Sequence, residues 1–412
     1  METKRWSLLL GALVLVATLI MAPLPGACAG APYKIGFITS ITGFMSPMGS
    51  GARDAAQLVV KRINSQGGVN GNPIELLMYD DASDPSKGVM ALKKLIEVDK
   101  VLAVIGPLST GIALACAPIA EKAQIVMFPQ NSSSWSVAEK PWDIPKPPTK
   151  IRHWIFKPGI DPLFQDIAIY QMLKGLGAKK LAHLNVNNAM GKAMRESFEA
   201  SHKGAGFDVV TWEEYGREDT DLTVPLTKIK GSAFDAIVIG GAEMAGAIAY
   251  KQAREMGIKQ PIIGMPPLGM AKLIEVVGKP LDGLLIPVYA VDLGEALPAD
   301  DPQRPAVVEL TKLVVQNTDS KRADTGHTAG WDGLYICEAA LKIAKPDPSD
   351  VEKARSQLRD GFEKVKGFAG SQCLGDMTKW HEIPAPMIPS KVQDGKLIGI
   401  GKKITPTWAD LE

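Results

Sequence analysis

Cysteine, histidine and net charge are all scarce in this sequence. Its 412 residues include four cysteines and five histidines, and 46 basic side chains against 45 acidic ones leave a formal net charge of +1. Four cysteines are too few for a scaffold held together by disulfides. A near-zero charge provides no long-range field to attract a phosphate backbone, so we expect no nucleic-acid partner. At roughly 150 residues per domain, the length predicts two or three compact units.

The motifs of common enzyme classes are missing as well. The sequence contains no G-x-S-x-G nucleophile elbow, no G-x-x-x-x-G-K-[ST] phosphate loop and no C-x-x-C pair. Gly49-Ser50-Gly51 begins like a dinucleotide-binding loop, but Asp54 takes the place of the third glycine, where a carboxylate would repel a pyrophosphate. We interpret this stretch as a tight turn. The histidines are scattered, and we predict no catalytic residue, no cofactor and no metal site.

The N-terminus has the pattern of a signal peptide. Lys4 and Arg5 precede an apolar run from Ser7 to Ala22, and Ala27-Cys28-Ala29 offers small residues for cleavage after position 29. We therefore predict a signal peptide at residues 1–29 and a periplasmic protein. Two alternatives remain open: an uncleaved membrane anchor, and lipidation at Cys28, although Pro25 stands where a bulky aliphatic residue is wanted. No later stretch reaches the ~18 apolar residues of a membrane span.

Three cysteines remain after the leader: Cys116, Cys337 and Cys373. An odd number in an exported chain allows at most one bridge and leaves at least one free thiol. Cys116 lies in an alanine-rich helical stretch, so we expect it to be a buried thiol. A bridge between Cys337 and Cys373 stays open at this stage.

Strand and helix patterns alternate along the first part of the mature chain. The strand at 101–105 is almost continuously apolar, as strands covered on both faces are. The expected strands are 33–40, 74–79, 101–105 and 124–128, and the expected helices are 52–63, 84–98 and 111–122. Such repeated strand–helix units predict a parallel sheet with helices on both faces.

A proline-rich passage, Pro141–Pro148, interrupts the alternation, which then restarts. Two series separated by one irregular passage predict an α/β protein of two Rossmann-like lobes with parallel sheets. The second series has strands at 180–185, 207–212, 236–239 and 261–264, and helices at 163–176, 192–203, 222–230, 243–256 and 272–277. Further helices follow near 305–315, 328–344 and 348–364, and Asp394-Gly395 marks a turn between two strands within 391–403.

Polar loops follow three strands of the first series. Ligands of open α/β sheets bind where strands end and helices begin, because backbone N–H groups point outward there. Hydroxyls and amides at these loops form a donor-rich cradle suited to a carboxylate. The competing interpretation makes Ser109 and Ser132 ordinary helix N-caps. The loops are 42–49, 106–111 and 129–134.

Several long strings resemble one family. IGFITSITGFMSPMGSGARDAAQLVVKRINSQGGVNGNPIELLMYDDASDPSKG, VLAVIGPLST and IVMFPQNSS are similar to the type I periplasmic substrate-binding proteins of ABC importers, in the leucine/isoleucine/valine branch. IVIGGAEMAGAIAYKQAREMGIKQPIIG and the strand pair at 391–403 also fit. The similarity spans essentially the whole mature chain, and INSQGGVNGNPIELLMYDDASDP is its most specific part.

The resemblance implies two lobes joined by three crossovers, which close on a small solute and deliver it to a permease in the inner membrane. Lobe 1 would hold residues 30–156 and 288–383, and lobe 2 residues 157–287 and 384–412. We expect the crossovers near Phe156–Pro158, Leu285–Val288 and Pro384–Pro389, and a monomeric protein.

The resemblance also assigns site residues. In lobe 1 the carboxylate cradle falls on the loops that hold Ser109, Thr110, Gln130, Asn131 and Ser132, and the aromatic residue of the first loop falls on Met48. In lobe 2, positions that are often tyrosine in amino-acid binders fall on Met190 and Ala242, and the acidic residue that holds an α-ammonium falls on Pro266 or Pro267. The disulfide of the family would join Ser83 and Ser109, which are both serines here.

These departures bear on the ligand. A buried ammonium without a counter-charge costs several kcal/mol. We therefore expect a small apolar or aromatic carboxylate without an ammonium group, in a cleft to which Met45, Met48, Met190 and Met265 contribute. The alternative is a branched-chain or other aliphatic amino acid, with Glu243 holding the ammonium. Two other classes compete, a periplasmic ligand sensor that feeds a signalling partner and a secreted α/β enzyme, which the missing motifs disfavour.

Overall fold

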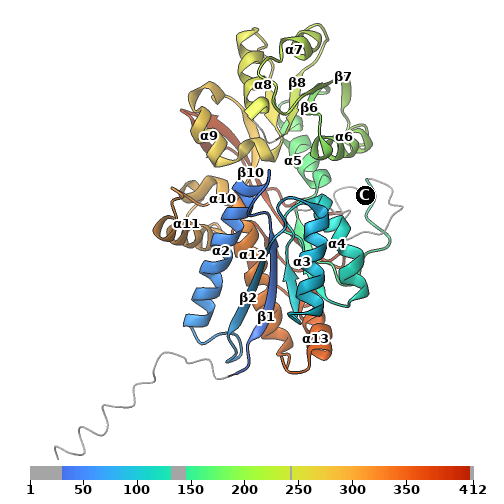
Figure 1. Ribbon diagram of the computed structural model, residues 1–412. Coiled ribbons are helices and arrows are strands. Elements are labelled where there is room, and N and C mark those ends of the chain that lie inside the picture. Colours follow the sequence, from blue (N-terminus) through green and yellow to red (C-terminus); the bar gives the residue numbers. More distant parts are fainter. Residues whose placement is uncertain (1–29, 131–144, 242–243, 409–412) are drawn as a thin grey trace, which may run out of the picture.

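The computed structural model describes residues 30–130, 145–241 and 244–408, which form two α/β lobes, one above the other in Figure 1. Each lobe is built around its own largely parallel sheet. The chain passes between the lobes more than once, so each lobe contains segments that lie far apart in the sequence (Figure 1). No helix in these described ranges combines the length and apolar character needed to cross a bilayer.

The sheet of lobe 1 has four parallel strands in the order β2 (Ile74–Asp80), β1 (Tyr33–Thr39), β3 (Ala103–Ile105) and β4 (Val126–Phe128). Side chains alternate along β1, as they must in a strand. Ile35 and Phe37 enter one core cluster and Ile38 enters another on the opposite face. Helices therefore cover both faces, as expected for a parallel sheet.

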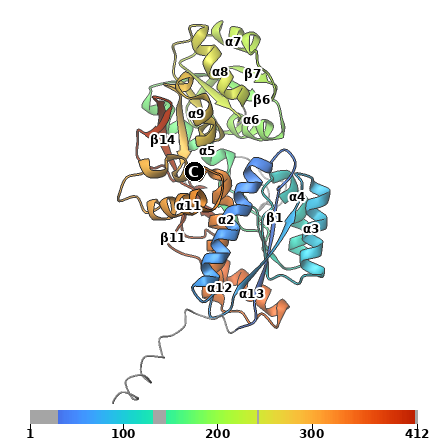
Figure 2. The ribbon, with the colours of Figure 1, turned by 60° about the vertical axis from the view of Figure 1, so that its left-hand side comes forward.

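One face of this sheet carries α3 (Pro85–Glu97) and α4 (Thr110–Lys122), and the other carries α2 (Ser46–Ser65), α12 (Thr325–Ala344) and α13 (Val351–Glu363). Figure 2 shows the two groups on either side of β1. The strand–helix alternation expected for this part of the chain is confirmed.

The start of α2 differs from the prediction. The helix begins at Ser46 rather than Ala52, so Gly49 and Gly51 lie inside it and the expected tight turn is wrong. The glycines serve close packing instead: a Cβ on Gly49 would lie 2.0 Å from the carbonyl oxygen of Ser40, at the end of β1. Glycine lowers helix propensity, but here it lets the first turn of α2 approach the strand end.

Lobe 2 has a seven-stranded sheet. Its order is β15 (Lys396–Gly399), β14 (Met387–Gln393), β10 (Leu285–Tyr289), β9 (Ile262–Gly264), β8 (Ala236–Gly240), β6 (Lys180–Val186) and β7 (Asp208–Tyr215). β14 pairs antiparallel with both β10 and β15, and the remaining neighbours are parallel. Asp394 and Gly395 both have positive φ between β14 and β15, which confirms the predicted turn.

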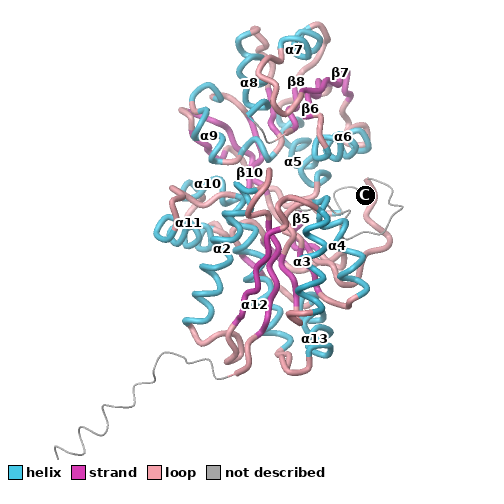
Figure 3. The backbone as a smooth tube through the Cα atoms, viewed as in Figure 1, coloured by secondary structure: helices cyan, strands magenta, loops and turns pink. Residues whose placement is uncertain are grey.

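Helices again cover both faces of the lobe 2 sheet. α5 (Pro162–Gly175) and α6 (Ala189–Ser201) share one core cluster with Leu181 of β6 and with alternate residues of β8. The opposite face packs against α7 (Thr223–Lys230), α8 (Met244–Glu255) and α9 (Ala271–Val277). The tube in Figure 3 shows strands enclosed by helices in both lobes.

Several short elements lie outside the two main sheets. β5 (Lys157–Gly159) pairs in parallel with β13 (Glu382–Pro384), so the first and third predicted crossovers run side by side. After β10, α10 (Ala290–Leu293) and α11 (Arg304–Asn317) lead towards α12. β11 (Phe368–Ala369) and β12 (Leu374–Gly375) form a small antiparallel pair, and single 3₁₀ turns lie at Pro266–Gly269, Lys279–Leu281 and Gly294–Ala296.

The three cysteines of the described chain, Cys116, Cys337 and Cys373, are buried free thiols. The bridge between Cys337 and Cys373 that the sequence left open is not formed. Cys116 belongs to the core cluster between the lobe 1 sheet and α4, as expected for a small apolar side chain.

Candidate functional site

The N-terminus of α4 is an open cluster of backbone donors at the strand ends of lobe 1. Ser109 is the N-cap residue, yet its side chain makes no capping hydrogen bond. Among the described residues, the N–H groups of Gly111 and Ile112 have no acceptor. These groups carry the partial positive charge of a helix start, which favours an anion. Ser109 and Thr110 are half-buried there, where the prediction placed the carboxylate cradle.

In two other helices of lobe 1, the N–H groups of the first turn donate to an aspartate side chain at the N-cap. The Asp84 carboxylate accepts from the N–H groups of Ser86 and Lys87 at the start of α3. Asp324 does the same for the first turn of α12. An aspartate at the N-cap satisfies these donors internally, so α4 differs from α3 and α12 in that the N–H groups of Gly111 and Ile112 stay available.

Gln130 follows β4 beside this helix start. Its backbone N–H donates to the Pro107 carbonyl over 3.1 Å, which joins the end of β4 to the loop before α4. The side chain is 2% exposed, and neither amide atom has a hydrogen-bond partner in the described parts of the chain. A buried amide without a partner is costly, so Gln130 is suited to receive a polar group from outside the chain.

The loop between β1 and α2 is held by hydrogen bonds to the end of β2. The Asp80 carboxylate accepts from the Ile41 N–H at 2.8 Å and from the Thr42 hydroxyl at 2.6 Å. Burial acts to raise the pKa of Asp80, but these hydrogen bonds outweigh it and lower the pKa overall. The Ser83 hydroxyl accepts from the Met45 N–H at 3.0 Å. Ser83 thus holds the loop by a hydrogen bond.

Met48 and Met45 lie at the start of α2, partly buried against the lobe 1 core. A Cβ on Gly326 would lie 3.0 Å from the Met48 Cα, so Met48 sits where α2 and α12 meet. Met265 is different: it is fully buried with Val238 and Ile263 in the core of lobe 2. The expectation that Met265 lines the ligand site is therefore wrong, because its side chain fills the space under the sheet.

The predicted residues of lobe 2 lie on separate loops. Asn188 caps α6 by accepting from the Gly191 N–H, and Met190 in the first turn is 38% exposed. Pro267 is half-buried in the 3₁₀ turn after β9. Four predicted residues, Asn131, Ser132, Ala242 and Glu243, lie outside the described residues.

The carboxyl ends of the two sheets meet between the lobes. Phe44, in the loop after β1, lies with its ring centre 5.8 Å from the guanidinium carbon of Arg217, in the loop after β7. Ligands of open α/β sheets bind at such ends. Two surface hollows of the described chain lie elsewhere, one on α11 and one between α5 and α6, and no predicted site residue lines either.

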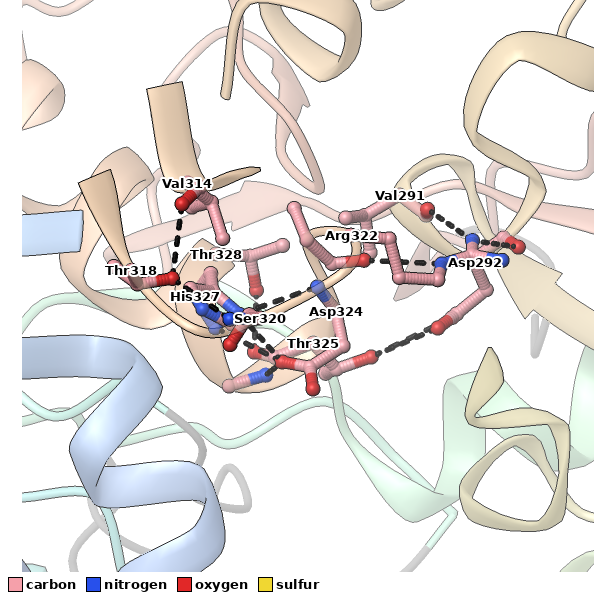
Figure 4. Close-up of polar contacts among 12 residues, drawn as sticks. Val291, Asp292, Val314, Thr318, Ser320, Arg322, Asp324, Thr325, His327 and Thr328 are labelled. Atoms are coloured by element: carbon pink, nitrogen blue, oxygen red, sulfur yellow. Dashed lines mark hydrogen bonds and ion pairs between the residues drawn. The ribbon is translucent and has the colours of Figure 1, made fainter. Parts of the chain in front are cut away.

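A polar cluster at the start of α12 was missed from the sequence (Figure 4). His327 Nδ1 lies 2.8 Å from the Asp324 carboxylate, and Thr325 donates to the Asp292 carboxylate at 3.3 Å. Arg322 donates to the Asp292 carbonyl at 2.7 Å. The cluster ties α12 to the segment after β10. Asp324, three residues before His327, was the available signal, since aspartate is a strong N-cap residue.

Two lobes that present the carboxyl ends of their parallel strands to each other, one of them with an open helix start, define a class of proteins that bind small solutes between their lobes. Comparison with family models gives the family: the model described as periplasmic binding protein matches residues 32–396. The chain belongs to this family.

Individual relatives are distant. A Leu/Ile/Val-binding protein of Rhizobium johnstonii is 27% identical over 61% of this chain, and the match spans 64% of that relative's length. A leucine-, isoleucine-, valine-, threonine- and alanine-binding protein of Pseudomonas aeruginosa is 23% identical, over 85% of this chain and 90% of its own length.

Solved structures share the fold over most of the chain. An extracellular ligand-binding receptor from Rhodopseudomonas palustris superposes with a TM-score of 0.77 at 24% identity, covering 90% of this chain and 99% of its own. The branched-chain amino acid transporter substrate-binding protein of Streptococcus pneumoniae, in complex with isoleucine, gives a TM-score of 0.72 at 22% identity, covering 91% and 100%. The two-lobed α/β fold that the sequence predicts is confirmed.

Proposed function

We propose that this chain is the extracytoplasmic solute-binding protein of an ABC importer and that it captures a small carboxylate between its lobes. The observation that carries the proposal is the open first turn of α4 beside Gln130. The N–H groups of Gly111 and Ile112 provide donors, and the buried Gln130 amide provides a further polar group without a partner in the described chain. Charge-assisted hydrogen bonds of this kind contribute ~1.5–3 kcal/mol each.

Capture requires the lobes to close on the solute. A ligand that touches both lobes stabilises the closed state only by the difference between its affinities for the closed and open states. Micromolar affinity corresponds to about −8.2 kcal/mol, which a few such hydrogen bonds and the burial of an apolar side chain supply. The contact between the loops after β1 and β7 supports a binding site between the lobes.

The first candidate ligand is a branched-chain or other aliphatic amino acid. The names of the relatives from Rhizobium and Pseudomonas support it, as does the isoleucine complex of the Streptococcus protein. An amino acid needs a counter-charge for its ammonium. Glu243 is the acidic residue of the loop after β8 that we propose for this role.

The second candidate is an apolar or aromatic acid that lacks an ammonium group. It is favoured by the described loops after β6, β8 and β9, which carry no acidic residue: they consist of Asn187 to Met190, Gly241, and Met265 to Met270. A site without a carboxylate does not compensate a buried ammonium. The two candidates share the carboxylate and differ only at the ammonium.

Calorimetric titration of ligand-free protein distinguishes them. We expect leucine, isoleucine or valine to bind, and Glu243→Gln to weaken that binding at least tenfold. Binding of benzoate-type or short-chain acids, unaffected by Glu243→Gln, would favour the second candidate. Gln130→Leu should weaken either ligand, whereas Ser86→Ala, an exposed change at the satisfied start of α3, should not. Absence of binding by every carboxylate tested, with native folding confirmed, would refute the proposal.

The location and partner follow from the same proposal. We propose export to the periplasm with removal of residues 1–29, function as a monomer, and delivery of the solute to a permease in the inner membrane. N-terminal sequencing of the secreted protein tests the cleavage after position 29, and a lipid-modified N-terminus at Cys28 would contradict it.

A further inference from the structure

One side-chain contact joins the rims of the two lobes. Phe44 belongs to lobe 1 and Arg217 to lobe 2, and the guanidinium carbon lies 5.8 Å from the ring centre. This is within the range of a cation–π interaction. Both side chains lie in solvent: Phe44 is 58% exposed, and the Arg217 side chain is 46% exposed. A phenylalanine this exposed contributes little to the core of lobe 1.

Both loops are held in shape by their own lobes. The Phe44 loop is fastened by Asp80 and by Ser83, which accepts from the Met45 N–H. On the other side, the Gly216 N–H donates to the Asp219 carboxylate at 2.6 Å, immediately before Arg217. Each lobe therefore presents its partner residue from an ordered loop, so that the contact depends mainly on the distance between the lobes.

The contact lies far from the connections between the lobes. In the lobe 2 sheet β10 and β14 neighbour each other, and β7 is the edge strand beyond β9, β8 and β6. The second and third crossover segments adjoin β10 and β14, and the first, β5, lies beside β13, which precedes β14. Arg217 instead follows β7. A rotation about the crossovers moves the β7 edge more than the strands near the axis. The Phe44–Arg217 distance is thus among the distances that lobe opening changes most.

We propose that Phe44 and Arg217 form a closure latch, which stabilises the closed arrangement of the lobes whether or not solute is bound. This inference rests on the proposed function, because the latch would control the closure of the lobes on the solute. Opening separates the pair, and the face of the guanidinium that contacts the ring then becomes exposed to water as well. An exposed cation–π contact of ordinary strength changes the ratio of closed to open molecules about two- to fivefold.

A distance measurement on ligand-free protein tests the latch. Spin labels at Lys87→Cys on α3 and Val224→Cys on α7 report the separation of the lobes, and both positions are exposed, while the three native cysteines of the described chain are buried. We expect Phe44→Ala and Arg217→Ala each to move the distance distribution towards longer values by a two- to fivefold change in population. The double variant should go no further than either single variant.

Two controls make the test specific. Phe44→Trp keeps an aromatic face and should preserve the wild-type distribution. Lys94→Ala removes a cation–π contact inside lobe 1, where Nζ lies 4.6 Å from the centre of the Tyr79 ring, and should change nothing. Unchanged distributions in both Phe44→Ala and Arg217→Ala, or fully additive effects in the double variant, would overturn the latch. Because no solute is present, a failure of the proposed ligand to bind leaves this result unaffected.

Discussion

Lys157 and Glu382 form an ion pair that is buried between two crossover strands. Lys157 Nζ lies 3.3 Å from Glu382 Oε1, and the two side chains are 0% and 3% exposed. The residues are direct neighbours in the register of β5 and β13. The other oxygen of Glu382 accepts from the Trp408 indole N–H at 3.2 Å. The pair therefore links two chain segments that connect the lobes.

Removing the lysine should destabilise the protein strongly. Lys157→Met leaves the Glu382 carboxylate buried without its counter-charge, and breaking one side of a buried pair costs about 3–5 kcal/mol. Urea unfolding followed by circular dichroism measures the loss of unfolding free energy. The double variant Lys157→Met/Glu382→Leu should recover much of it, because apolar residues can replace a buried ion pair.

A surface pair provides the matched control for that experiment. Lys251 lies 3.7 Å from Glu255 on α8, and both side chains are more than half exposed. Lys251→Met should change the unfolding free energy by less than about 1 kcal/mol. Equal effects of Lys157→Met and Lys251→Met would show that the pair of Lys157 and Glu382 contributes no more to the unfolding free energy than a surface pair.

Acid should destabilise lobe 2 through His183. This histidine is fully buried on β6, and burial, followed by the charges of Arg195 and His202, lowers its pKa to about 3. Between pH 6.5 and 3 His183 is protonated in the unfolded chain but stays neutral in the folded chain. The free energy of unfolding therefore falls as the pH falls. From pH 7 to pH 5 the loss attributable to His183 is about 2 kcal/mol.

The variant His183→Phe should remove this part of the pH dependence. The ring lies 4.8 Å from both Phe198 and Trp212, so an aromatic replacement suits the site. Unfolding free energies at pH 7 and pH 5 give the slope directly. A wild-type slope retained in His183→Phe would contradict the assignment.

The parallel helices α2 and α12 are close enough to require glycine. A Cβ on Gly330 would lie 2.1 Å from the Ala52 carbonyl oxygen, which is backbone and cannot swing away. Gly330→Ala should therefore lower the melting temperature by several degrees, consistent with a loss of about 2–3 kcal/mol. Gly175, at the end of α5, has open space around it. Gly175→Ala should be neutral or stabilise the protein by up to ~1 kcal/mol.

The thiols should be inert in the native protein. Burial raises the pKa of Cys116 and of Cys337 to about 12, and it also raises the pKa of Cys373. A thiol this difficult to ionise reacts slowly with disulfide reagents. Protein lacking residues 1–29 should release three equivalents with Ellman's reagent in guanidinium chloride and almost none without it. One equivalent after denaturation would reveal a bridge.

Periodicity predicted the architecture because both sheets are largely parallel and are covered by helices on both faces. The apolar run at 101–105 and the alternating helices specify layers by pattern alone. The turn at Asp394-Gly395 was equally local, since its residue types tolerate positive φ. These features depend on residues that are close together in the sequence, so one sequence is enough to predict them.

Other features depend on contacts that no local pattern encodes. The early start of α2 follows from the packing of Gly49 on Ser40 and of Gly51 near His327. Met265 resembled a site residue in sequence but fills the core, because its direction is set by the register of β9 with β8. The buried pair of Lys157 and Glu382 joins residues more than two hundred positions apart.

In the candidate site, too, some features follow from local sequence and others depend on tertiary contacts. Ser109 and Thr110 were found because a helix start after a parallel strand is a general ligand position. The sequence alone did not show that N–H groups at the start of α4 are available. The structure shows it by comparison with α3 and α12, where aspartate side chains accept from the first-turn N–H groups. The contribution of Arg322, which reaches carbonyls after β10, depends on the tertiary path of the chain.

The position of β14 has a consequence for the order of assembly. This strand comes from the last thirty residues of the chain, yet it lies inside the lobe 2 sheet, hydrogen-bonded along the whole of β10. Until it arrives during synthesis, β10 presents an unpaired edge that invites association with other chains. A nascent chain that stops short of Met387 therefore leaves lobe 2 unfinished, and the sheet is completed only when a strand about a hundred residues after β10 has been synthesised.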